Sequence, residues 1–162
     1  MDILNLAIEM EKEGEAFYLE QKENNENFGL KAVCGLLAKE EAKHREIIES
    51  KISGGASEFK DVDLKKCIKE IYPRDEQFEI EIKAQPDQFD FYRLAMEKEQ
   101  KSIELYKGLL GKSEDEEVKK LLLFLIAQEE KHYKLFDEMS QMLRHADEWV
   151  EAPEFGLRNE EY

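Results

Sequence analysis

Residues 11–18 read EKEGEAFY, residues 40–44 read EEAKH, residues 99–106 read EQKSIELY and residues 129–132 read EEKH. The last two segments repeat the first two at a shift of 88 residues. Each half contains a Glu, a Tyr seven residues later and a Glu-x-x-His thirty residues after the first Glu. Because Glu fills 30 of 162 positions, one Glu-x-x-His would carry little weight. Two halves that match at four polar positions indicate two copies of one structural unit.

Around these segments, apolar residues recur at three- and four-residue spacing, which predicts four long amphipathic helices. Asp2 and Asp87 are the expected N-caps of the first and third helices. Ser113 and Glu116 have the spacing of a capping box, which predicts that the fourth helix starts there. The expected helices cover residues 3–22, 28–51, 88–111 and 113–145.

The connections between these helices predict the topology. Short turns join the first helix to the second and the third to the fourth, whereas a long crossover covers about residues 54–86, with one short helix near residues 64–71. Two hairpins joined by a crossover form a ferritin-like four-helix bundle. We therefore expect an all-α domain over residues 1–146, followed by a tail over residues 147–162.

Composition limits the function classes. The formal net charge of −15 argues against nucleic acids and anionic membrane surfaces as partners, since both are polyanions. The sequence contains no apolar run of membrane-spanning length and no signal peptide. Its two cysteines, Cys34 and Cys67, lie far apart and imply no disulfide framework. We expect a cytoplasmic protein.

The repeated polar residues fall in the middle of the apolar helix faces, so they are expected in the bundle interior. Within each hairpin the two repeated glutamates are equally far in sequence from the turn. At about 1.5 Å of rise per residue, they reach the same height on neighbouring helices. Each His lies three residues after a Glu and shares its face. The candidate metal ligands are Glu11, Glu41, His44, Glu99, Glu129 and His132.

Four carboxylates buried together repel one another and lose hydration, so they must be protonated or neutralised by cations. Two divalent metal ions would balance four carboxylates and leave neutral imidazoles as further ligands. One Glu from each of two helices and a Glu-x-x-His from each of the other two is the ligand set of di-iron and di-manganese bundles. Nitrogen and oxygen ligands without thiolate suit Fe or Mn better than a structural Zn site, so two Fe ions, two Mn ions or a mixed pair are expected.

At these four segments the sequence resembles the rubrerythrin branch of the ferritin-like superfamily, and the resemblance covers roughly residues 3–145. It implies that Glu41 and Glu129 bridge the metals, that Glu11 and Glu99 each bind one metal, and that His44 and His132 serve one metal each. Tyr18 and Tyr106 would contact the ligands from outside, although an ordinary core role for both tyrosines is equally compatible with the sequence. Family members commonly reduce hydrogen peroxide.

The sequence departs from that family at two points. Rubrerythrins carry another Glu three residues after the helix-three ligand, where this chain has Ser102. They also carry a rubredoxin domain with paired Cys-x-x-Cys motifs, which Cys34 and Cys67 cannot supply. We therefore expect a stand-alone bundle, forming a homodimer, in which His44 stays bound in every redox state and a separate protein such as a rubredoxin supplies electrons.

Four functions remain open at this point. The leading hypothesis is a di-iron oxidoreductase that reduces hydrogen peroxide or oxygen. The alternatives are a ferritin-like protein that oxidises and stores iron, a manganese catalase, and a helical interaction module without enzymatic activity. The metal content and the size of the assembly would separate them.

Overall fold

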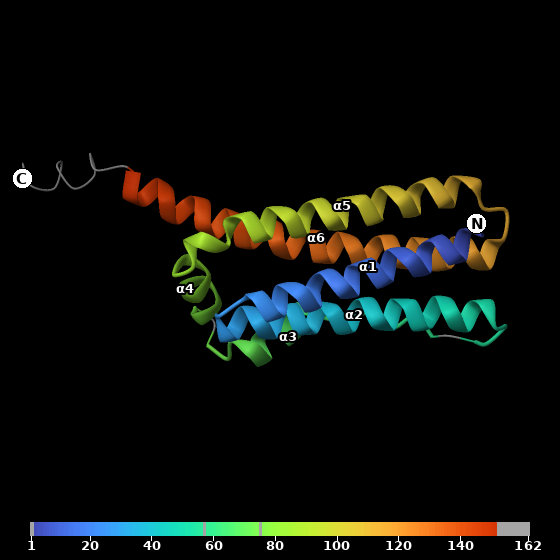
Figure 1. Cartoon of the computed structure of the whole chain (residues 1–162), viewed down its shortest axis with the longest axis horizontal. Coiled ribbons are helices and arrows are strands. Elements are labelled where there is room, and N and C mark those ends of the chain that lie inside the picture. The colour runs from blue at the N-terminus through green and yellow to red at the C-terminus, as the bar shows by residue number, and fades with distance from the viewer. Residues whose placement is uncertain (1, 57, 75, 152–162) are drawn as a thin grey trace, which may run out of the picture.

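The computed structural model describes residues 2–56, 58–74 and 76–151, and within these ranges all regular structure is helical. Four long helices form the body of the molecule, and short helices lie in the crossover between the second and the third (Figure 1). In chain order they are α1 (Ile3–Asn24), α2 (Phe28–Ile52), α3 (Leu64–Ile71), α4 (Gln77–Lys83), the 3-10 helix η1 (Pro86–Gln88), α5 (Phe89–Lys112) and α6 (Glu116–Glu151).

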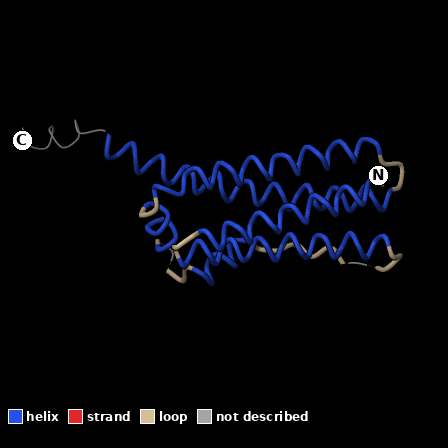
Figure 2. The backbone as a smooth tube through the Cα atoms, viewed as in Figure 1, coloured by secondary structure: helices blue, strands red, loops and turns tan. Residues whose placement is uncertain are grey.

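The predicted all-α bundle is confirmed. Helix α1 packs along α2 and α5 packs along α6, so each half of the repeat forms one hairpin (Figure 1). The crossover places α3 and α4 at the end of the bundle away from the N-terminus, and the loops that Figure 2 draws in tan connect them. None of the helices described has the length and apolar character needed to span a membrane.

Several helix boundaries differ from those expected. Ser113 is not the N-cap of α6 but ends α5, with its N–H donating to the Leu110 carbonyl. Asp115 caps α6 instead, because its carboxylate accepts from the N–H groups of Glu117 at 2.9 Å and Val118 at 3.4 Å. The capping box predicted at Ser113 is therefore wrong.

Asp87 is not the N-cap of α5, since it lies inside η1 and α5 begins two residues later. Asp2 occupies the N-cap position of α1 without a side-chain hydrogen bond. The crossover contains the expected α3 and also α4, which was not predicted. Helix α6 continues to Glu151, beyond the expected end near His145.

The core consists of two apolar clusters separated by a polar layer at mid-bundle. Tyr18 belongs to one cluster and Tyr106 to the other, and the repeated glutamates and histidines lie between them along each helix. The first cluster includes Tyr18, Leu30, Leu37, Tyr92 and Phe136, and the second includes Ile8, Ile48, Tyr106, Leu122 and Leu125. Packed side chains on both sides therefore hold the polar layer and keep water out.

Candidate metal centre

The polar layer gathers all six candidate ligands from four different helices. Each of the six side chains is at most 3% exposed. Their donor atoms form two groups in which every atom lies within 4.8 Å of the others. One group is Glu11, Glu41, His44 and Glu129; the other is Glu41, Glu99, Glu129 and His132.

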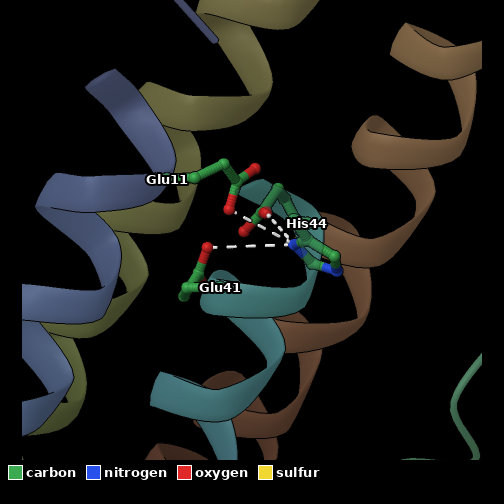
Figure 3. Close-up of side chains that lie close together, drawn as sticks. Glu11, Glu41 and His44 are labelled. Carbon is green, nitrogen blue, oxygen red and sulfur yellow. Dashed lines mark hydrogen bonds and ion pairs between the residues drawn. The ribbon is translucent and has the colours of Figure 1, made fainter. Parts of the chain in front are cut away.

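The first group is built around Nδ1 of His44. This nitrogen lies 3.3 Å from Oε2 of Glu11 and 3.2 Å from Oε1 of Glu129. Figure 3 shows Glu11 reaching from α1 and Glu41 from α2, both directed at the His44 ring. The Glu41 oxygen is 3.9 Å from the same nitrogen. Three carboxylates therefore converge on one imidazole nitrogen.

The second group repeats this arrangement around Nδ1 of His132. This nitrogen lies 3.3 Å from Glu41, 3.5 Å from Glu129 and 3.6 Å from Glu99. The rings of His44 and His132 are nearly parallel, with centroids 5.9 Å apart. Glu41 and Glu129 thus face both imidazoles, whereas Glu11 and Glu99 each face one.

The donor atoms fit a pair of metal ions. Within the described part of the chain, several buried atoms of the layer have no hydrogen-bond partner: Glu41 Oε1, Glu99 Oε2, both Glu129 carboxylate oxygens and His132 Nδ1. Buried oxygens and nitrogens without partners cost free energy unless a cation binds them. Carboxylate and imidazole donors without thiolate suit iron or manganese.

Protons occupy part of this layer in the metal-free protein. Burial, together with Glu41 and Glu129, raises the pKa of Glu11 well above its ordinary value. Burial, together with Glu129 and Glu41, raises the pKa of Glu99 in the same way. The two glutamates that face only one histidine therefore favour their protonated form.

The two shared glutamates shift in the opposite direction. Burial alone would raise the pKa of Glu41, but the close approach of Glu11 and of both histidines outweighs it and lowers that pKa to about 2. Burial likewise acts to raise the pKa of Glu129, but the close approach of Glu99 and of both histidines outweighs it and lowers that pKa well below its ordinary value. The carboxylates common to both groups therefore stay ionised.

The histidines balance this charge. Burial acts to lower the pKa of His44, but the carboxyl groups that face its ring, Glu11 first and then Glu129 and Glu41, raise that pKa well above 6.5. For His132, Glu99 is the first of the groups that outweigh burial, and the pKa again lies well above 6.5. Two imidazolium ions beside two carboxylates leave the metal-free layer close to neutral.

Hydrogen bonds from two tyrosines link the two halves of the repeat. Tyr106 on α5 donates to Glu11 on α1 at 2.6 Å, and Tyr18 on α1 donates to Glu99 on α5. Each hydroxyl therefore bonds to the glutamate that faces a single histidine. Both tyrosines are fully buried. The contacts link the two hairpins and fix one oxygen of each glutamate.

Sequence reasoning missed Glu40, which is 2% exposed and lies one residue before Glu41. Its Oε2 is 3.2 Å from Nε2 of His132 and 4.0 Å from Nε2 of His44. A carboxylate on the outer nitrogen fixes the orientation of a ligating imidazole. The repeat could not reveal it, because the equivalent position in the second half is Gln128.

The crossover contributes to the burial of the layer. Gln128 donates to the carboxylate of Asp61 at 3.0 Å, and Lys131 also bonds that carboxylate. Phe59 stacks on Phe124 with ring centroids 5.1 Å apart, and Phe124 packs edge-on against His44. The extended segment before α3 is thereby tied to α6 and covers the His44 side of the layer.

Three further side chains are absent from both groups of candidate ligands. Ser102, where rubrerythrins carry a Glu, is buried and its hydroxyl donates to the Lys98 carbonyl, so it brings no carboxylate to the layer. Glu15 pairs with Arg45 at the edge of the bundle. Cys34 is buried, and burial raises the pKa of its thiol to about 12, which leaves it unreactive.

A pocket of about 670 Å³ lies apart from this layer, between the crossover and α6. Its lining includes Ile68, Tyr72, Phe78 and Leu135, and none of the six candidate ligands. The pocket is therefore separate from the six candidate ligands.

Comparison with known proteins agrees with this geometry. No curated protein and no solved structure matched the chain. Among protein families, Rubrerythrin matched residues 2–140, which contain α1, α2, the crossover, α5 and most of α6. Rubrerythrins are di-iron carboxylate proteins, and the buried carboxylate and histidine groups could bind metal in the same way. The chain belongs to the rubrerythrin family.

Proposed function

We propose that this protein binds two iron ions in the polar layer and reduces hydrogen peroxide to water. The observation that carries the proposal is the pair of four-residue groups that share Glu41 and Glu129. A shared pair of carboxylates between two imidazoles is the arrangement that holds two metals close together. Membership of the rubrerythrin family supports iron as the metal.

The six residues have separate roles in this proposal. Glu41 and Glu129 would bridge the metals, Glu11 and His44 would complete one position, and Glu99 with His132 would complete the other. When bound, the reduced metal pair supplies the two electrons that cleavage of the oxygen–oxygen bond requires. Two protons complete the reduction of one peroxide to two waters.

The chain's own residues prepare the site for small substrates. Apolar clusters on both sides of the layer exclude bulk water, which strengthens electrostatic interactions inside it. The hydroxyl of Tyr18 donates a hydrogen bond to one oxygen of Glu99, and the hydroxyl of Tyr106 donates one to an oxygen of Glu11. These bonds keep the carboxylates oriented while substrate enters and leaves.

Electrons would come from a separate protein, which we propose is rubredoxin-like. The sequence offers no second redox centre, because two distant cysteines cannot build the four-thiolate site of a rubredoxin. The net charge of −15 favours a donor with a basic docking surface.

Elemental analysis and single-turnover kinetics test the proposal. Protein loaded with ferrous iron without oxygen should hold two irons per chain and consume about one peroxide per iron pair, resuming only when reduced rubredoxin is added. Glu129→Gln should lose the iron pair. The exposed neighbour Glu130, which pairs with Lys107 on the surface, provides the control Glu130→Gln, which should keep both irons.

Two results would contradict the proposal. Fewer than two irons per chain in wild-type protein would remove the metal centre itself. Continued uptake of ferrous iron with oxygen, far beyond two per chain, would favour iron storage instead, and a large shell in size-exclusion chromatography would accompany it.

A further inference from the structure

Lys98 carries a buried ammonium that the ligand set does not explain. It lies on α5, one residue before Glu99, and its Nζ is enclosed without a hydrogen-bond partner among the described residues. Lysine at the edge of a helix bundle normally extends its ammonium into water. Burying a cation costs free energy unless charges of opposite sign lie close to it.

The ammonium lies beside one of the shared carboxylates. A Cβ placed on Gly14 of α1 would lie 2.8 Å from Nζ of Lys98 and 3.0 Å from both Cδ and Oε2 of Glu41. The missing side chain of Gly14 therefore leaves the space into which Lys98 and Glu41 both reach. Glycine destabilises the interior of a helix, so its presence at position 14 fits a position where Lys98 and Glu41 must approach the backbone of α1 closely.

The repeat shows that this arrangement occurs only once. At the shift of 88 residues, Lys98 corresponds to Met10 and Gly14 corresponds to Ser102. The first half thus has an uncharged side chain where the second half has a cation. The six ligands are common to both halves, whereas Lys98 makes one side of the layer more positive.

The neighbouring carboxylates keep this group charged. Burial acts to lower the pKa of Lys98, but the ionised carboxylates of the layer, Glu41 first among them, outweigh it and raise the pKa above its ordinary value. Since a lysine side chain is protonated at neutral pH, Lys98 brings a positive charge to this side of the layer.

We propose that Lys98 is a positioning residue that supplies a fixed positive charge beside Glu41 and strengthens the binding of small anions to the metal-loaded protein. The ligand class is a small, hard anion, such as azide or the conjugate base of hydrogen peroxide. The inference rests on the proposed metal centre and extends it, because it concerns which ligands that centre accepts.

A fixed charge affects anions and metal ions in opposite directions. It attracts an incoming anion and repels the metal cations themselves. Lys98→Met should therefore weaken anion binding by roughly tenfold, while metal affinity stays equal or becomes tighter. A variant that merely disturbs packing would weaken both, so the two readouts together separate the charge from a structural role.

The experiment compares four iron-loaded, oxidised proteins: wild type, Lys98→Met, Lys98→Arg and the control Lys101→Met, whose side chain is exposed on the same helix. Azide affinity is measured by optical titration, and iron content and affinity are measured separately. We expect weaker azide binding in Lys98→Met alone, recovery in Lys98→Arg, and two irons in every protein.

The outcomes separate this inference from the proposed function. Two irons per chain with equal azide affinity in wild type and Lys98→Met would overturn the role of Lys98 and leave the metal centre intact. Parallel loss of iron and azide binding in Lys98→Met would also overturn it, since that result indicates a packing role. A wild-type protein that binds no metal pair would overturn both.

Discussion

Loading the metal-free protein with two divalent cations should release about four protons near pH 6.5. The reason lies in the charges of the polar layer before metal binds. Burial and neighbouring carboxylates keep Glu11 and Glu99 in their protonated form. The surrounding carboxylates keep His44 and His132 protonated as well. Each of these four groups must lose one proton before it can bind a metal.

Charge balance gives the same number. The metal-free layer contains two ionised carboxylates, Glu41 and Glu129, and two imidazolium ions. Two divalent cations bring four positive charges into a region without water, where a net charge is costly. The departure of four protons leaves the net charge of the layer unchanged. Metal affinity should therefore rise steeply with pH across the range in which these groups are protonated.

Calorimetry with manganous ion provides the assay, because this metal does not oxidise during the titration. The apparent enthalpy is measured in two buffers of different ionisation enthalpy, and the difference gives the number of protons released. Glu11→Gln should lower the release by about one proton, since the amide carries no ionisable proton. Glu13→Gln, at an exposed position on the same helix, is the control and should leave it unchanged. Release close to zero with two metals bound, or no difference for Glu11→Gln, would refute the charge assignment.

Three other predictions concern single features. His44→Ala should remove about one metal equivalent in every redox state, since Ser102 offers no carboxylate that could replace the imidazole. His145→Ala, at an exposed position of α6, is the control and should retain both metals by elemental analysis. The free energy of unfolding of the metal-free protein, measured by chemical denaturation, should fall as pH rises above 6.5. The raised pKa values of His44 and His132 stabilise the fold only while both side chains are protonated. Metal-loaded protein should not show this loss. Asp115→Ala should destabilise the fold by about 1 kcal/mol through loss of the α6 cap, while equal effects of Asp115→Ala and Ser113→Ala would contradict the cap assignment.

Periodicity and the repeat were sufficient to predict the four long helices, the two hairpins and the interior position of the repeated polar residues. These features follow from sequence alone because each depends on spacing within one chain segment. Helix ends were predicted less well, since several residues compete to cap each one. Ser113 and Asp115 both have suitable side chains, and only the path of the chain out of α5 decides that Asp115 accepts the free N–H groups. Helix α4 has no comparable periodic signal, because it is only seven residues long.

The residues missed in the layer share one property. Glu40 and Lys98 do not recur at the 88-residue shift, so a search for matched positions could not detect them. A different signal was available in the same comparison. Where the ligands match and a neighbouring position changes in charge, as from Met10 to Lys98, the mismatch points to a difference between the two sides of the site. The hydrogen bonds from Tyr18 to Glu99 and from Tyr106 to Glu11 could not be predicted from sequence either, because they depend on how the two hairpins pack.

The layer therefore combines a symmetric ligand set with asymmetric surroundings. His132 has a carboxylate on its outer nitrogen at 3.2 Å, whereas the outer nitrogen of His44 is 4.0 Å from the same group. Lys98, near Glu41, adds a charge that the equivalent Met10 does not. Two metals in identical surroundings would bind and react alike, but these residues make the two positions inequivalent. The duplicated hairpin thus supplies two matched groups of ligands, and the unmatched residues would make two metals bound there behave differently.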